Sequence, residues 1–423
     1  MRIGIIGAIG VDDIGDIVML EAGLKQLLEA ARNKSTSIDF TVFALDVKKT
    51  IEQINKMNIH AKIKVVNSLK AENLAVTLQN EITFEDLLEK NFKSIIKDKE
   101  YIFNIEECDA LFFIGGGYFN EYWGNRLLPT FIIPILIGYQ LNKPVFISGV
   151  NIGPFSNELL KNLKGLFRNV DTITLRDRSP SIEVLDKLGG TEGKLILGAD
   201  DILPIWYERK NYYNYPELED QKSFAVIQLH HWVEMYSESY IEFYKTLSAF
   251  FDEILDKKVI EKIYFLPFTY FKGVDYECGR RLKTFINDRG EYVVLEPTDD
   301  HIFMRELIRE SKFVIGSRYH PVVYALGENV PVLGIYVNDL YKQKISGAYD
   351  VLGIDKEHNM VYINAISTDT LMRWYEYAIE DNYSVDHNKK SDLISEYGFN
   401  RKKSIESFIE RINMKNFVKE VEE

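Results

Sequence analysis

Short apolar runs alternate with amphipathic segments along the first 207 residues of the chain. The apolar runs predict buried strands, and the segments between them, whose apolar positions follow a helical period, predict helices. Strands are expected at residues 3–6, 40–44, 62–66, 111–114, 145–148, 173–175 and 195–197. Helices are expected at 16–32, 47–57, 84–98, 126–141, 157–168 and 180–188. Strands that alternate with helices are typical of a largely parallel sheet.

A polar stretch rich in Tyr and Asn, 208–220, separates this first domain (1–207) from a second α/β pattern, and we interpret it as a linker. The second domain, 221–365, is expected to contain strands at 225–229, 262–266, 292–295, 313–316 and 332–335. Its helices are expected at 240–257, 276–288 and 302–310, followed by a helix that Pro321 opens from its first turn. The last segment, 366–423, is expected to form helices at 368–381 and 400–412 that pack back across both domains.

Length, composition and charge agree with a globular protein of two domains. Single cores stop growing at about 250–300 residues, and this chain has 423, of which 46% are hydrophobic. Fifty-one basic against 64 acidic residues give a net charge of −13. This balance argues against nucleic acid as a partner.

Cysteine usage and the apolar runs bear on the compartment. Cys108 and Cys278 lie in different predicted domains, so neither a disulfide framework nor a zinc site is expected, and a reducing compartment fits best. The longest apolar run, 127–141, is too short to span a bilayer. The chain begins with a strand pattern instead of a signal sequence. We therefore expect a soluble, cytoplasmic protein, and leave open a peripheral contact with the inner face of a membrane.

Glycines and acids follow the first strand in the segment 7–16, GAIGVDDIGD. Their spacing matches neither a P-loop nor a dinucleotide-binding fingerprint. Two interpretations stay open. The segment is a tight turn in which Asp13 or Asp16 complements the helix N-terminus, or Gly10 lets backbone amides approach a ligand while an acid holds a hydroxyl group or an arginine.

Polar residues in loops after later strands suggest a second set of contacts. The segment 109–125, DALFFIGGGYFNEYWGN, places Gly116, Gly117 and Asn120 among aromatic residues, which suits the apolar face and the hydroxyls of a sugar. Close backbone packing is the alternative. Asn151 lies in the loop of ISGVNIGPF, 147–155. Arg176 follows another strand, and the acids of 198–201, GADD, are expected either to orient it or to cap the turn.

Arg318 and His320 lie just beyond the strand 313–316, in a predicted turn. In an open α/β sheet, groups past the carboxyl end of a strand face the crevice where ligands bind. A guanidinium suits a carboxylate or a phosphate, and an imidazole moves protons near neutral pH. The pair therefore suggests an anionic substrate that needs acid–base catalysis, with a histidine satisfied inside its own turn as the alternative. His230 and His231 are expected on opposite faces of a strand, which argues against a shared metal.

Taken in order, these segments resemble the polysaccharide pyruvyl transferase family, enzymes that use phosphoenolpyruvate (PEP) to place a pyruvate ketal on a sugar. The resemblance covers about residues 3–355 and rests on an ordered set of short motifs. They are G-x-x-G…G-D (Gly7, Gly10, Gly15, Asp16), DALFFIGGG (109–117), NIGPF (151–155), LRDRS…L (175–179, 185), A-D (199–200), RYH…AL…VPV (318–320, 325–326, 330–332) and K-x-x-G (Lys344, Gly347).

The resemblance implies an α/β architecture of two doubly wound Rossmann-like domains that face each other across a cleft, a glycosyltransferase-B-like fold with PEP in the cleft. It also implies that Arg318 and His320 match family positions that bind PEP. Arg176 and Lys344 are then further cationic contacts of the donor.

The resemblance and the residue chemistry together give a mechanistic hypothesis. His320 is the general acid that protonates the methylene carbon of PEP, after which C2 accepts a sugar hydroxyl, phosphate leaves and a second hydroxyl closes the ketal. Asp16 or another loop acid accepts hydroxyl protons. The acceptor is a sugar, a polysaccharide or a lipid-linked glycan. Its expected contacts are Gly10, Gly116, Gly117, Asn120 and Asn151. PEP is a co-substrate, and the hypothesis requires neither a cofactor nor a metal.

Three departures from the family pattern keep alternatives open. Asp13 replaces a common Asn, Tyr319 and Pro321 flank the histidine, and 228–231 lacks an arginine often found at that strand end. One alternative is a glycosyltransferase of the twin-Rossmann type that uses a nucleotide sugar. The other is a non-catalytic sugar-binding or assembly protein that keeps the fold.

Overall fold

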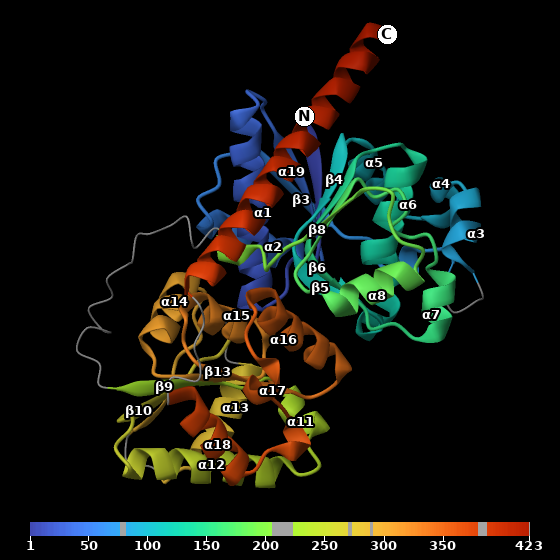
Figure 1. The fold of residues 1–423 in the computed structure, drawn as a ribbon. Coiled ribbons are helices and arrows are strands. Elements are labelled where there is room, and N and C mark those ends of the chain that lie inside the picture. The colour runs from blue at the N-terminus through green and yellow to red at the C-terminus, as the bar shows by residue number, and fades with distance from the viewer. Residues whose placement is uncertain (77–81, 205–222, 270–272, 288–290, 380–386, 423) are drawn as a thin grey trace. The chain divides into compact units, whose positions relative to one another are not determined.

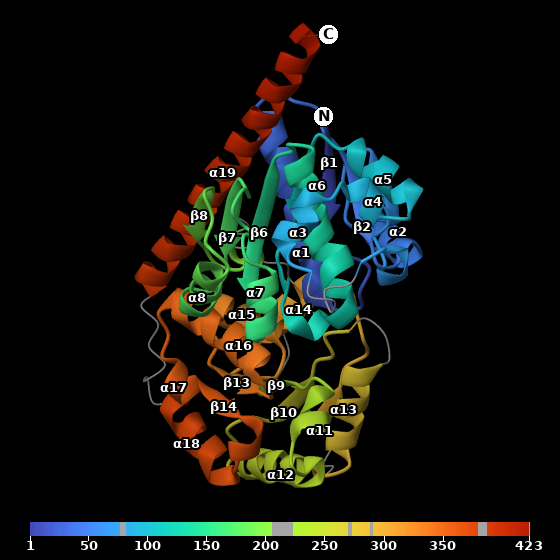
Figure 2. The same ribbon diagram turned by 90° about the vertical axis from the view of Figure 1, so that its right-hand side faces the viewer.

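The structure is a computed structural model that describes residues 1–76, 82–204, 223–269, 273–287, 291–379 and 387–422. The chain divides into two compact units, drawn in Figures 1 and 2. Unit 1 consists of Met1–Val11, Asp16–Ile205 and Ile394–Glu423, and unit 2 of Asp12–Gly15 and Trp206–Leu393. The short segment Asp12–Gly15 therefore belongs to unit 2. The linker predicted at 208–220 lies outside the described residues.

Unit 1 is built on a sheet of eight parallel strands. Their order is β3 (Ile63–Asn67), β2 (Asp39–Ala44), β1 (Arg2–Ile6), β4 (Ala110–Phe113), β6 (Val145–Ile152), β7 (Thr172–Leu175) and β8 (Lys194–Leu197). Off this row, β5 (Gly116–Phe119) pairs with β6. The strands predicted for this part of the chain are all present. The sequence did not predict β5, because glycines are poor strand formers.

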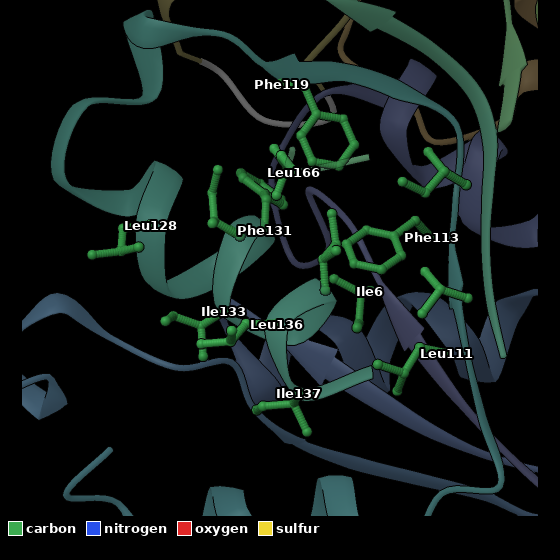
Figure 3. Close-up of a cluster of buried hydrophobic side chains, with 14 of the residues drawn as sticks. Ile6, Leu111, Phe113, Phe119, Leu128, Phe131, Ile133, Leu136, Ile137 and Leu166 are labelled. Carbon is green, nitrogen blue, oxygen red and sulfur yellow. The ribbon is translucent and has the colours of Figure 1, made fainter. Parts of the chain in front are cut away.

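Successive residues of the central strands point to opposite faces of this sheet, and both faces are buried. Phe112 of β4 and Phe146 of β6 belong to one apolar cluster. Leu111 and Phe113 of β4 belong to the other. Figure 3 shows part of this second cluster, where Leu111 lies near Ile137. A parallel sheet covered on both sides requires the nearly continuous apolar strands found in the sequence.

Helices cover the two faces of the unit 1 sheet. On one face lie α1 (Ile14–Asn33), α2 (Val47–Lys56) and part of α19 (His387–Glu422), which contribute to the cluster with Phe112. The other face is covered by α3 (Phe84–Glu89), α4 (Phe92–Ile95), α5 (Lys99–Glu106), α6 (Ile133–Gln140), residues following α7 (Asn157–Asn162), and α8 (Ser179–Lys187). A single-turn helix, η1 (Ala71–Asn73), follows β3.

Three predicted helices are wrong in extent. The helix expected at 84–98 is split into α3 and α4, with the unpredicted α5 after it, because Thr83, Asn91 and Asp98 each cap a new start. The helix expected at 126–141 is interrupted: η2 (Glu121–Arg126) is a 3-10 helix, η3 (Leu127–Ile132) is a π-helix, and only then does α6 begin. Its prolines lack the N–H donors that a continuous helix needs. The helix expected at 157–168 ends at Asn162.

The C-terminal helix α19 is longer than the 400–412 predicted, spanning 36 residues. From Ile394 onward it belongs to unit 1. Phe408 packs against Phe146, with ring centroids 5.5 Å apart. Arg401 forms a buried ion pair with Asp201, 2.6 Å from Nη2 to Oδ2. Among the described residues, no helix combines the length and apolar character needed to cross a membrane.

Unit 2 is built on a second sheet, of six parallel strands. Their order is β11 (Tyr292–Val294), β10 (Lys262–Phe265), β9 (Phe224–Gln228), β12 (Val314–Gly316), β13 (Val332–Tyr336) and β14 (Met360–Tyr362). β9 and β12 are therefore neighbours in the centre of the sheet. The predicted strands are present, whereas β14 was not predicted.

The helices of unit 2 lie on both faces of its sheet (Figure 1). They are α11 (Trp232–Tyr236), α12 (Tyr240–Asp256), α13 (Val274–Lys283), α14 (His301–Glu310), α15 (Tyr319–Glu328), α16 (Asp339–Leu352), α17 (Lys356–Asn359) and α18 (Thr368–Ile379), with the single turn η4 (Ile363–Ala365). The sequence did not predict α11, α16 or α17. Asn338 is the N-cap residue of α16, and its side chain accepts a hydrogen bond from the N–H of Tyr341.

Candidate active site

Arg318 and His320 lie at the carboxyl end of β12, at the start of α15. Arg318 is the N-cap residue of α15, and His320 lies in the first turn of the helix instead of the predicted turn. The helix therefore begins two residues before Pro321. The N–H groups of a first turn have no partner within the helix, so the N–H that proline lacks costs no hydrogen bond there. This is the edge of a parallel sheet at which α/β proteins bind ligands.

The guanidinium of Arg318 is held by two carboxylates. Asp275 of α13 accepts from Nε at 2.7 Å and from Nη2 at 2.8 Å, a bidentate pair. Asp13 accepts from Nη1 at 2.6 Å. Burial alone would lower the pKa of Arg318, but the charges of Asp275 and Asp13 raise it above its usual value. The arginine is therefore always charged, and its fork is already aligned to bind anions.

Asp275 is fixed before any ligand arrives. It is fully buried, and its Oδ2 also accepts hydrogen bonds from Gln228 Nε2 at 3.1 Å and from the Phe268 N–H at 3.2 Å. Gln228 ends β9, and its Oε1 accepts a bond from the N–H of Arg318 at 2.9 Å. Asp275 and Gln228 thus position the arginine. No motif of the sequence pointed to Asp275, which precedes the helix predicted at 276–288 but lies in the first turn of α13.

The loop segment that carries Asp13 is tied to unit 2 through its backbone. The N–H of Ile14 donates to the carbonyl of Phe268 at 3.0 Å, and Asp13 forms an antiparallel bridge with Thr269. The Asp13 side chain accepts a bond from the Gly15 N–H at 2.8 Å. These bonds hold the carboxylate at Arg318 in a defined place.

Gly15 and Asp13 both meet the imidazole of His320. A Cβ added at Gly15 would lie 1.6 Å from Nδ1 of His320, so only glycine fits there. Asp13 Oδ1 lies 3.8 Å from the same Nδ1. One carboxylate therefore faces both the guanidinium of Arg318 and the imidazole of His320. Both uses predicted for an acid in segment 7–16 are present, because Asp13 accepts from the Gly15 N–H in the first turn of α1 and also holds an arginine.

His230 lies beside Arg318, past the end of β9. Its N–H donates to Ser317 Oγ at 2.7 Å, and its Nδ1 accepts from the Trp232 N–H at 3.2 Å. That bond selects the neutral tautomer with a proton on Nε2. Burial first, and then the charge of Arg318, lower the pKa of His230. His230 is therefore a neutral N–H donor at this edge.

The prediction that His230 and His231 point to opposite faces of a strand is wrong. Their ring centroids are 4.2 Å apart. The physical reason is that β9 ends at Gln228 and the backbone turns, with helical φ and ψ at His231, into α11. The strict alternation of a strand no longer applies to these residues.

Lys344 of α16 lies near the same cluster. Its Nζ is 5.5 Å from the ring centroid of Tyr341. Tyr341 in turn stacks on His230, with centroids 5.9 Å apart, and meets the edge of Trp232 at 5.3 Å. The charge of Lys344 also contributes to the lowered pKa of His230. Unit 2 therefore gathers three of the predicted residues, Arg318, His320 and Lys344, at one edge of its sheet.

Asn151, predicted to lie in a loop, is part of β6 in unit 1 and contacts Arg176. Arg176 Nε donates to Asn151 Oδ1 at 2.6 Å, and its Nη1 pairs with Asp200 Oδ2 at 3.0 Å. Arg176 is only 2% exposed. Asp200 both orients this arginine and, through Oδ1, caps the turn by accepting from the Ile202 N–H at 3.2 Å. A contact between Arg176 and PEP stays a prediction.

The predicted acceptor loops of unit 1 are shaped by close packing. Asn120 is buried, donates to the Gly117 carbonyl at 2.7 Å and accepts from the Tyr122 N–H at 3.0 Å, so it caps the following turn. A Cβ at Gly116 would lie 2.7 Å from the Tyr118 ring, and one at Gly10 2.7 Å from a backbone carbonyl. Asp16 lies in the first turn of α1. Ligand contacts of these residues stay predictions.

Comparisons with known protein families and with curated proteins both give matches. The family model described as Polysaccharide pyruvyl transferase matches residues 14–339. Amylovoran biosynthesis protein AmsJ of Erwinia amylovora is 30% identical over 103 residues, which are 24% of this chain and 24% of that protein. The chain thus spans about a quarter of the length of the curated relative it matches.

Solved structures similar to this chain include two UDP-GlcNAc 2-epimerases and MurG. UDP-GlcNAc 2-epimerase from Neisseria meningitidis has a TM-score of 0.61 at 11% identity and covers 97% of this chain and 100% of its own. The Methanocaldococcus jannaschii UDP-GlcNAc 2-epimerase has 0.55 at 13%, covering 96% and 99%. MurG from Acinetobacter baumannii has 0.51 at 11%, covering 97% and 99%. At identities this low, the similarity shows the fold alone. The similar folds confirm the predicted glycosyltransferase-B-like class.

Proposed function

Because the chain belongs to the polysaccharide pyruvyl transferase family, we propose that it transfers the pyruvyl group of PEP to a sugar as a ketal, with release of phosphate. The observation that carries this proposal is the pair Arg318 and His320, which lies at the carboxyl edge of the unit 2 sheet within the matched region. The acceptor is a sugar, a polysaccharide or a lipid-linked glycan of the cell envelope. The name of the matched relative, a biosynthesis protein for amylovoran, supports a role in polysaccharide assembly.

Arg318 is the main contact for the donor. Asp275 occupies its Nε and Nη2, so Nη1 is the nitrogen that remains for a substrate anion. Asp13 holds that position with its own carboxylate. A carboxylate or phosphate of PEP replaces Asp13 at Nη1 with the same kind of charge-assisted hydrogen bond.

Lys344 and His230 complete the donor contacts in unit 2. PEP carries two anionic groups, and removing both from water requires more than one cationic partner. Lys344 supplies a second positive charge, and the neutral His230 supplies an Nε2–H that donates without adding charge. The lowered pKa of His230 keeps this donor neutral across the working pH range.

His320 supplies the proton. The imidazolium gives its proton to the methylene carbon of PEP, and C2 then accepts the oxygen of the first sugar hydroxyl, whose proton passes to a base. Breaking the bond between C2 and the bridging oxygen releases phosphate, and a second hydroxyl of the same sugar closes the ketal at C2 and gives its proton to the departing phosphate. Asp13, 3.8 Å from Nδ1, stabilises the charged imidazolium.

The proposal is tested by calorimetry with PEP and with a panel of nucleotide sugars, followed by a phosphate-release assay with candidate acceptors. A pyruvyl transferase binds PEP and releases phosphate from it only with an acceptor present. The rival nucleotide-sugar glycosyltransferase, whose support is the fold alone, binds the nucleotide sugar and leaves PEP unbound. A non-catalytic relative binds acceptors without phosphate release.

A further inference from the structure

Unit 1 contains a pocket of about 350 Å³ that the motifs above do not explain. Its walls come from the segments after β3, β5 and β6, together with α7. These strands are parallel, and each wall therefore begins at the carboxyl edge of the sheet. The volume lies at the lower end of the range of about 300–1,000 Å³ typical of small-molecule sites.

The walls of the pocket are held together by hydrogen bonds between the two loops that follow β5 and β6. The N–H of Gly153 donates to the carbonyl of Phe119 at 2.7 Å, and the N–H of Glu121 donates to the carbonyl of Pro154 at 3.3 Å. Glu121 Oε2 accepts from the Ser156 N–H at 2.9 Å. Asn120 caps the turn that leads into this wall. The pocket is therefore built by the fold itself before a ligand binds.

The lining is apolar on one side and carries oxygen acceptors on the other. Leu74, Leu127, Leu128 and Leu159 supply apolar surface. Figure 3 shows Leu128 at the margin of the buried cluster of this unit. Amide and hydroxyl groups line the pocket as well.

Two carboxylates, those of Glu121 and Glu158, set the charge of the pocket. The described residues that line it include no Lys, Arg or His. A phosphate or carboxylate placed here would face like charge without a counter-ion, which is unfavourable. The pocket therefore does not suit PEP or the diphosphate of a nucleotide sugar.

An uncharged polyhydroxyl ring with an apolar face matches this lining. Its hydroxyls can donate to the carboxylates of Glu121 and Glu158 and exchange hydrogen bonds with the side chains of Asn125 and Asn162. Its C–H face can pack on the leucine side chains. Glu158 is exposed, so the pocket is open to solvent and a longer glycan can continue beyond it.

We propose that this pocket binds a neutral hexose or N-acetylhexosamine unit of the acceptor glycan. The inference rests on the proposed function in that the acceptor of a pyruvyl transferase is a sugar. It adds that acceptor recognition is carried in unit 1 by Glu121, Glu158 and the leucine wall. Asn120, predicted to contact the acceptor, acts here as a positioning residue that shapes the loop.

The test uses the full chain and ligand-observed saturation-transfer NMR. The probes are the methyl glycosides of glucose, galactose, mannose, N-acetylglucosamine and N-acetylmannosamine. Two variants probe the pocket: Leu159→Trp fills it, and Glu158→Ala removes an acceptor from an exposed side chain without threatening the fold. Lys161→Ala, on the same helix but outside the lining, is the matched control. PEP binding is measured by calorimetry on every variant.

We expect at least one glycoside to bind, Leu159→Trp to weaken it by about tenfold or more, Glu158→Ala to weaken it less, and Lys161→Ala to leave it unchanged. PEP affinity stays constant throughout. If PEP binds but no glycoside does, or if both pocket variants bind the glycoside as tightly as the wild type, the pocket is not the acceptor site. If glycoside binding depends on the pocket but PEP does not bind, the site stands and the pyruvyl transfer proposal fails.

Discussion

Oδ2 of Asp13 lies 2.6 Å from Nη1 of Arg318, although the two residues are 305 positions apart in the chain. With Asp275 on the other edge, one guanidinium is shared by two carboxylates, so the group as a whole carries one excess negative charge. An anionic donor that uses Arg318 must compete with Asp13. Under the proposed function, the affinity for PEP therefore depends on Asp13 as well as on the residues that bind the donor.

Replacing Asp13 by asparagine is expected to tighten PEP binding and slow turnover. The amide side chain would keep an oxygen near Gly15 but would remove the charge that competes at Arg318 and that stabilises the imidazolium of His320. Bonds to charged groups are worth about 1.5–3 kcal/mol, so a gain of about tenfold in affinity is expected. Calorimetry gives the binding constant, and phosphate release gives the rate.

Asp12→Asn is the matched control for this change, because it alters the net charge equally one position away. It is expected to leave PEP affinity within about twofold of the wild type. Equal effects of both substitutions would show that overall charge, and not competition at Nη1, sets the affinity. An Asp13→Asn variant that binds PEP more weakly would contradict the competition.

Much of the fold is visible in the sequence because its cause is local. Strands buried on both faces read as continuous apolar runs, and these runs placed β1, β4, β6, β9 and β12 within a few residues. Helix starts inside the segment 84–98 depend on single capping residues, which periodicity does not weigh. The wrong orientation predicted for His230 and His231 also came from an element boundary, because it depended on the residue at which β9 ends.

The candidate site was only partly predictable. Arg318 and His320 follow a recognisable strand, and strand order places them at a ligand-binding edge. The partners of Arg318 come from positions 43 and 305 residues away, and nothing in a single sequence encodes such pairs. The sequence left two uses of an acid in segment 7–16 open, and the structure combines them in Asp13, which could not be predicted without knowing that the loop reaches Arg318.

Gly15→Ala is expected to displace His320. The added methyl would lie 1.6 Å from Nδ1 and 2.0 Å from Cε1 of the imidazole, well inside contact distance. Overpacking of this kind costs about 1–3 kcal/mol of stability, and phosphate release should be lost with the displaced imidazole. Thermal unfolding and the phosphate assay measure the two effects.

The double variant Gly15→Ala with His320→Ala isolates the cause. Removing the imidazole frees the space for the methyl group, so its stability should return to that of His320→Ala alone. A double variant as unstable as the sum of the single changes would mean that Gly15 is required for another reason, because independent effects add.

Lys390 of α19 is expected to give unit 2 a pH-dependent stability. Its ammonium is buried and donates to the last carbonyls of α15, at 3.0 Å for Gly327, and to Asn329. Burial lowers the pKa of Lys390 to about 8, against about 10.4 in an unfolded chain. Between these values the unfolded chain binds more protons than the folded chain, so the free energy of unfolding rises with pH. The destabilisation that comes from burying the charged ammonium is complete below about pH 8 and disappears above about pH 10.4.

Lys390→Met removes that penalty together with the hydrogen bonds. Between about pH 7.5 and about pH 9.5, the unfolding temperature of the wild type should therefore rise relative to that of the variant. The expected rise is about 2–4 °C for each kcal/mol of unfolding free energy. Lys161→Ala, an exposed lysine in unit 1, serves as the control and should show no such movement. A constant difference across this range would contradict a buried ammonium with a lowered pKa.

His320→Ala separates binding from chemistry. The proton donor would be lost while Arg318 and Lys344 keep their charges, so PEP should still bind. General acid catalysis contributes about 10²–10⁴-fold, and phosphate release should fall by that factor with any acceptor that the wild type uses. Unchanged turnover would remove His320 from the mechanism.

The proposed role of Arg318 is tested by a calorimetric titration of PEP into the wild type and into Arg318→Lys, with a nucleotide sugar as the competing ligand. Lysine keeps one positive charge but cannot form the fork that meets Asp275 and the donor together. We expect PEP to bind the wild type, Arg318→Lys to bind it at least about tenfold more weakly, and the nucleotide sugar not to displace it. Equal PEP affinity in the two proteins, or binding of the nucleotide sugar in place of PEP, would contradict the proposal.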